Sequence, residues 1–114
     1  MTAFKLANPV KFVLSGVHGP RREVDISEIT LRPVRSNDLR LLEEFKGQPA
    51  SLALYGTAAL SGHTVAQVKK IDIDDYAPIA VAVLRALAAA SARIGIRPEF
   101  FIDPDALSLD RHLT

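Results

Sequence analysis

Apolar and polar residues alternate through the first third of the chain. The alternation runs over residues 10–14, returns over 24–26 and continues over 29–31. A period of two is typical of half-buried β-strands. The apolar positions change from even to odd numbers within residues 26–29. Because a slip of one residue turns the side chains that follow to the other face of a sheet, this change predicts a β-bulge near Ser27–Glu28.

These strands are predicted to form a hairpin over residues 4–33. The segment Ser15–Pro20 is rich in the residues that favour turns, and Pro33 ends the second strand because proline has no N–H for the ladder. Phe4–Leu6 adds a short further strand, so the hairpin is expected to have two to three strands. Since a lone hairpin is only marginally stable in water, it needs a surface to pack against.

A helical period of three and four replaces the alternation from Ser36 onward. Ser36 or Asn37 can cap a first helix, with Asp38 in its first turn and Gly47 and Pro49 after its end. The inner face of this helix is expected to hold Leu39, Leu42 and Phe45.

A second helix is predicted over residues 50–61, ended by Gly62 and weakened by Gly56. Thr64 and Gln67 have the spacing of a capping box, which predicts a short third helix. The inner side chains of the second helix are expected to be Leu52, Tyr55 and Ala59.

The last helix is predicted to be capped by Asp72 or Asp74 and to include residues 76–94, with Pro78 in or just after its first turn. It is apolar nearly all round, because Arg85 is the only charged residue between Asp75 and Arg93. A helix of this kind is buried on most sides, either by its own chain or by a partner. The residues expected to line the core or a partner-binding surface are Tyr76, Ile79, Val83 and Leu87.

The elements together predict an α+β fold, with an N-terminal β-hairpin followed by a bundle of about four helices. Residues 1–94 form a single domain in this interpretation, with the hairpin at 4–33 and the helical part at 36–94. Residues 95–114 form a C-terminal tail that contains the apolar run Phe100–Ile102 and a helix start at Asp103-Pro104.

Composition narrows the classes of function. The 114 residues carry a net charge of +1, which gives no basic stripe for nucleic acid or anionic lipid. The absence of cysteine excludes disulfides, thiolate zinc sites and cysteine nucleophiles. The apolar stretch Tyr76–Ala90 is too short for a membrane span, and the N-terminal residues lack the apolar run of a signal peptide. We therefore expect a cytoplasmic protein that binds neither membranes nor nucleic acid.

The titratable residues suggest no chemistry. Asp72–Asp75 starts like a calcium loop, but the positions that need glycine and glutamate hold Ala77 and Val83. The three histidines have no second ligand three or four residues away, and Ser61 and His63 lack the spacing and the orienting acid of a nucleophile and base. No catalytic, cofactor or metal site is predicted.

Residues 62–68 and the helix that follows loosely resemble a helix-turn-helix. The second helix would offer only Arg85 and Arg93 to a DNA groove, against alanine and valine. A small DNA-binding regulator therefore remains only as a lesser alternative.

Three short motifs follow one another in the order of a known family. They are Glu28–Leu39, with the sequence EITLRPVRSNDL, then Leu60-Ser61-Gly62, then Val68–Tyr76, with the sequence VKKIDIDDY. This order resembles the tail assembly chaperones of Mu-like and related contractile-tailed phages and prophages. The resemblance covers about residues 8–92, and Pro78 departs from the uninterrupted helix that the family has there.

The resemblance implies a non-enzymatic protein that binds the tape measure protein and assists tail tube assembly. It implies action in the host cytoplasm, through contacts with the tape measure and tail tube proteins, and absence from the finished virion. The surplus of apolar helix adds the expectation of a homo-oligomer. The alternative from the same setting is a small structural tail or tail-completion protein.

Overall fold

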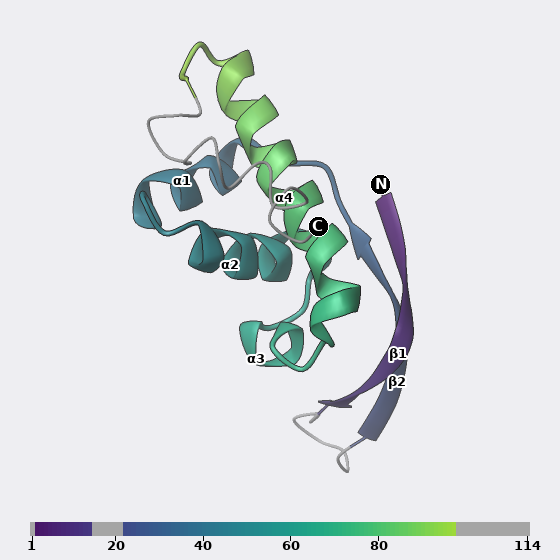
Figure 1. Cartoon of the computed structure of the whole chain (residues 1–114). Helices are drawn as coiled ribbons and strands as arrows, with labels where there is room; N and C mark the ends of the chain where they lie inside the picture. The colour runs from purple at the N-terminus through teal and green to yellow at the C-terminus, as the bar shows by residue number, and fades with distance from the viewer. Residues whose placement is uncertain (1, 15–21, 98–114) are drawn as a thin grey trace.

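The computed structural model describes residues 2–14 and 22–97, in which an antiparallel hairpin is followed by helices (Figure 1). β1 (Thr2–Leu14) pairs with β2 (Arg22–Leu31). The predicted α+β class is therefore confirmed. The hairpin has two strands because Phe4–Leu6 belongs to β1 itself. The predicted turn at 15–20 and the apolar run and helix start after residue 97 lie outside the described residues.

The strand register breaks once, opposite Ser27. Lys5 pairs with Glu28 and Val10 with Ile26, so β1 takes five steps where β2 takes two. The sequence pattern placed the irregularity correctly along β2, but the extra residues are in β1. A shift in the apolar alternation of one strand does not show which of the two paired strands contains the extra residues.

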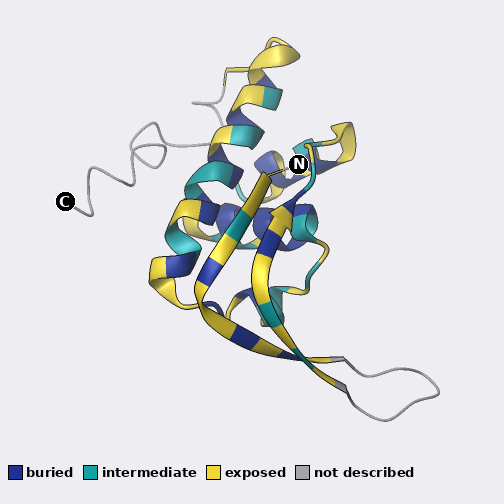
Figure 2. Ribbon diagram, turned by 90° about the vertical axis from the view of Figure 1, so that its right-hand side faces the viewer, coloured by how far each residue is buried: buried dark blue, intermediate teal, exposed yellow. Residues whose placement is uncertain are grey.

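The two faces of the hairpin have opposite characters, as the alternation of buried and exposed residues in Figure 2 shows. Phe12 and Ile29 are buried on the inner face. On the outer face Lys5 lies opposite Glu28 and Lys11 opposite Asp25, so unlike charges face each other across the strands.

The helical part follows the predicted boundaries closely. Its elements are a 3-10 turn η1 (Ser36–Leu39) and the helices α1 (Arg40–Glu44), α2 (Pro49–Ser61), α3 (Val65–Val68) and α4 (Ile73–Arg93).

Local signals fix most of the helix ends. Gly62 ends α2 in the left-handed conformation at φ 76°. Thr64 and Gln67 form the predicted capping box, with hydrogen bonds of 3.0 and 3.1 Å. Asp72 caps α4 by accepting the Asp74 N–H at 2.9 Å.

The cap of the first helix differs from the prediction. Arg35 occupies the N-cap position, not Ser36 or Asn37, and its N–H donates to the Asp38 carboxylate at 2.7 Å. The Asp38 carboxylate, three residues into the helical part, thus accepts the N–H of the N-cap residue. Its contact with the Arg32 guanidinium holds it in this position.

The helix α4 lies between the hairpin and the helices α1 and α2 (Figure 1). The core forms around it from buried side chains of both strands and all the longer helices. The prediction that Tyr55 points inward is wrong. Tyr55 is 43% exposed and stacks on Phe45 with ring centroids 4.6 Å apart, because α2 buries Leu52 and Thr57 instead.

Candidate functional site

The predicted core-or-partner residues of α4 lie in the core of this chain. Ile79, Val83 and Leu87 are each 0% exposed, and Tyr76 is half-buried at their edge. The first three side chains leave no surface for a partner to contact in this fold. Of the two roles that the sequence left open for them, the structure shows the core role.

The helix α2 crosses α4 closely at Gly56. A Cβ atom at this position would lie 2.7 Å from Cγ1 of Val83 and 3.4 Å from Cδ1 of Leu87. The glycine predicted as a weak point of the helix is therefore a position where α2 packs closely against α4. Its missing side chain is what allows Val83 to be fully buried.

The Tyr76 hydroxyl is buried and makes no hydrogen bond within the described part of the chain. Burial raises the pKa of Tyr76, and the neighbouring Thr57 hydroxyl offsets this only in part. The Thr57 hydroxyl donates to the Ala53 carbonyl at 2.7 Å. The phenol is thus held neutral at the edge of the core.

The first motif forms the joint between β2 and the helical part. The Arg32 guanidinium donates to both oxygens of the Asp38 carboxylate, at 2.8 and 3.0 Å. Asp38 is 6% exposed, and its pKa is lowered chiefly by this contact with Arg32 and then by the Arg35 N–H. Two charges that are six residues apart therefore fix the direction in which the chain leaves the hairpin.

The third motif ties α4 to the bulge of β1. The Asp75 carboxylate accepts the backbone N–H groups of Ala7 and Asn8, each at 2.9 Å. These donors, Asn8 first, lower the pKa of Asp75. Both N–H groups belong to the segment of β1 that has no ladder partner. Asp75 therefore supplies the hydrogen-bond acceptors that the unpaired N–H groups of the bulge would otherwise lack.

The first two motifs meet at a surface hollow of about 220 Å³. We call it the β2–α4 hollow, and its lining residues are Thr2, Leu31, Arg32, Pro33, Val34, Leu60, Ala82 and Ala86. The Arg32 N–H donates to the Leu60 carbonyl at 2.9 Å, which joins the two motifs directly. The small side chains of Ala82 and Ala86 leave the floor of this hollow open on α4.

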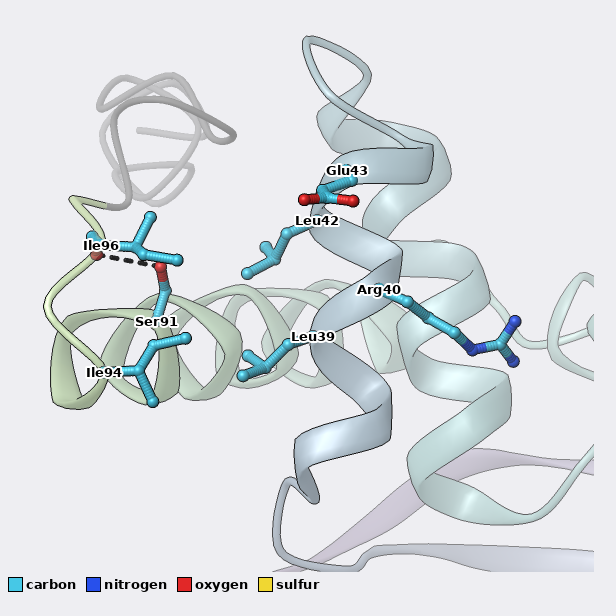
Figure 3. A pocket seen from close by; sticks show the side chains of 7 residues that line it. All are labelled: Leu39, Arg40, Leu42, Glu43, Ser91, Ile94 and Ile96. Atoms are coloured by element: carbon cyan, nitrogen blue, oxygen red, sulfur yellow. Dashed lines mark hydrogen bonds between the residues drawn. The ribbon is translucent and has the colours of Figure 1, made fainter.

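A second hollow of about 250 Å³ lies between α1 and the C-terminal end of α4 (Figure 3). We call it the α1–α4 hollow, and its lining residues are Leu39, Arg40, Leu42, Glu43, Ser91, Ile94 and Ile96. Ile94 is 58% exposed and Ile96 37% exposed, and in Figure 3 both side chains point across the hollow toward Leu39 and Leu42.

Sequence reasoning missed Ile96 as part of this wall. Gly95, at φ 82°, turns the chain back, and the Ile96 N–H donates to the Ser91 carbonyl at 3.1 Å. The Ser91 hydroxyl in turn donates to the Ile96 carbonyl at 3.0 Å. An apolar residue directly after a helix-ending glycine was the available signal.

Ser61 and His63, the candidate nucleophile and base, make structural contacts instead. The His63 ring packs edge-on against Phe12 at 5.0 Å, and its backbone N–H donates to the Ser61 hydroxyl at 3.4 Å. Ser61 thus stabilises the C-terminal end of α2. Within residues 2–14 and 22–97, no three His, Asp or Glu side chains gather as a metal site would require. His18 and His112 lie outside the described residues.

In the helix-turn-helix alternative, α4 would be the helix that enters a DNA groove. The helix α4 turns Ile79, Val83 and Leu87 into the protein's own core, so this face cannot enter a groove. Among the helices that the structure describes, none combines the length and the apolar character needed to cross a membrane.

Comparisons with protein-family models, curated proteins and solved structures found no match to this chain.

Proposed function

We propose that this protein is a non-enzymatic assembly chaperone of a contractile phage tail, which binds the tape measure protein and assists tail tube assembly in the host cytoplasm. The observation that carries the proposal is the order of the three motifs, Glu28–Leu39, Leu60–Gly62 and Val68–Tyr76. Each motif occupies a joint of the fold, and the first two meet at the β2–α4 hollow.

The β2–α4 hollow suits an apolar helical client. Its walls include Leu31, Val34 and Leu60, and its floor on α4 is formed by the small residues Ala82 and Ala86. Small residues let another backbone approach closely, and an amphipathic helix binds by placing its apolar face in such a depression. We therefore assign the contact with the tape measure protein to this hollow.

Co-expression with the tape measure protein of the same genome tests the proposal. We expect the tape measure protein to become more soluble and to co-purify with this chain. Ala86→Arg, which fills the hollow, should abolish both effects. Ala89→Arg is the matched control, because Ala89 is an exposed residue of α4 that does not line the hollow. Unchanged solubility with the unmodified chain would overturn the chaperone assignment.

Mass spectrometry of purified phage particles separates the chaperone from the structural alternative. A chaperone is released during assembly, so its peptides should be missing from finished tails. Peptides of this chain present in proportion to tail proteins would identify it as a structural tail or tail-completion protein instead.

A further inference from the structure

The α1–α4 hollow is an apolar depression that the described residues leave partly open. Its rim carries Arg40 and Glu43, while Ile94 and Ile96 present apolar surface to solvent. The hydrogen bonds of Ser91 with Ile96 fix this wall in place. An open depression lined by leucine and isoleucine gains free energy when apolar atoms cover it.

The size of the hollow restricts its occupant. An engineered apolar cavity of about 150 Å³ lined by similar side chains binds benzene. A hollow of about 250 Å³ that is open on one side can therefore hold one phenyl ring with a neighbouring aliphatic group. It is too small for the full face of a partner helix.

The chain itself carries such groups a few residues beyond the hollow. Phe100, Phe101 and Ile102 follow Ile96, which lines the hollow, in the sequence. A chain segment spans at most about 3.6 Å per residue, so Phe100 lies within about 14 Å of Ile96 in every conformation. A tethered group this near has an effective concentration in the millimolar range, which favours it over a second molecule.

We propose that the segment Phe100–Ile102 of the same chain docks in the α1–α4 hollow and places one phenyl ring between Ile94 and Leu39. A segment docked there would cover the exposed side chains of Ile94 and Ile96. This proposal does not depend on the chaperone function, since it concerns a contact within one chain at a hollow away from the β2–α4 hollow.

Disulfide trapping in the full chain tests the docking, because the natural chain has no cysteine. Glu43→Cys on the rim is combined with Glu99→Cys, which keeps both phenylalanines. The control pair is Ala89→Cys with Glu99→Cys. Ala89 is exposed and two residues before Ser91, so it faces about 200° away from the hollow.

We expect the rim pair to form an intramolecular disulfide ~10-fold faster than the control pair. Equal rates for the two pairs would show that the segment is not docked in this hollow and would overturn the proposal. Disulfide-linked dimers as the main product of the rim pair would also overturn it, in favour of a second copy as the occupant.

Thermal unfolding gives a test without cysteines. Phe100→Ser/Phe101→Ser should lower the Tm by about 5 °C, the shift expected for losing a modest apolar contact in a domain of this length. Ile94→Ser should make the chain insensitive to the two phenylalanine changes, since its contact is then already lost. Leu107→Ser/Leu109→Ser is the control and should leave the Tm unchanged. Additive effects of the Ile94 and phenylalanine changes would contradict the docking.

Discussion

At the scale of single residues, Gly56 shows how one missing side chain sets the distance between two helices. Its ideal Cβ position lies 2.7 Å from Cγ1 of Val83, a side chain that is 0% exposed. Valine is stiff about χ1, so it cannot rotate away at low cost. The crossing of α2 and α4 therefore depends on glycine at this position, although glycine is a poor helix former.

Gly56→Ala should for this reason destabilise the protein. The substitution gains about 1 kcal/mol of helix propensity but overpacks the crossing at a cost of about 1–3 kcal/mol. We expect a net loss of unfolding free energy, measured by urea denaturation followed by circular dichroism.

The same substitution made in a Val83→Ala background provides the control. The valine methyl group that clashes is then absent, so Gly56→Ala should be neutral or stabilising. An equal cost in both backgrounds would show that the crossing is not limited by Val83.

At the scale of the elements, the contact between α4 and the β1 bulge depends on ionised Asp75. Its pKa is lowered by the N–H groups of Asn8 and Ala7, so the folded chain holds the proton less tightly than the unfolded chain. A carboxyl group whose pKa is lowered by folding stabilises the protein at pH values above its ordinary pKa of about 3.9. This stabilisation is lost as the pH falls through the lowered pKa of the folded state.

Asp75→Asn should therefore lower the unfolding free energy at pH 7, where an amide oxygen replaces two charged acceptors. The difference from the unmodified protein should begin to shrink as the pH falls below about 4, where the unfolded chain takes up the proton, and should vanish below the lowered pKa of folded Asp75, where the natural carboxyl is protonated as well. Asp38, whose pKa is lowered chiefly by Arg32, remains in both proteins and keeps part of the acid sensitivity. A difference that stays constant from pH 7 to acid would contradict this role of Asp75.

The elements also show which features a sequence reveals. The ends of α2, α3 and α4 were predictable, because Gly62, Thr64 and Asp72 act on neighbours within a few residues. The bulge in β1 was assigned to the wrong strand, since its stabilising partner Asp75 is 67 and 68 residues away.

Contacts between distant elements limited the prediction of the site as well. The sequence identified the apolar helix α4 but left open which molecule covers it, because a periodic pattern does not name the covering surface. The two hollows arise where β2, α1 and α2 meet α4, and no local pattern marks them. Of the residues that line them, Leu39 and Leu42 were predicted on the inner face of the first helix, but no pattern indicated an open hollow beside them.

At the scale of the whole molecule, the hairpin and the helices share one core. Phe12 of β1 is 1% exposed, packs edge-on against His63, and belongs to the same buried cluster as the residues of α4. Asp75 adds a polar link between the same two parts. Because a two-stranded hairpin is marginal by itself, we expect the hairpin and helices to unfold in one cooperative step.

Phe12→Ala tests this cooperativity. Removing a buried phenylalanine should cost about 3–5 kcal/mol. The chain has two tyrosines and no tryptophan, and Tyr55 and Tyr76 both lie in the helical part. Tyrosine fluorescence therefore reports on the helices alone, and in the variant its urea midpoint should fall together with that of the circular dichroism.

Val13→Ala, next in the same strand but 43% exposed, should change the stability by less than about 0.5 kcal/mol. A tyrosine transition that does not move in Phe12→Ala would mean that the helices fold without the hairpin, and that the core around α4 is complete before β1 joins it.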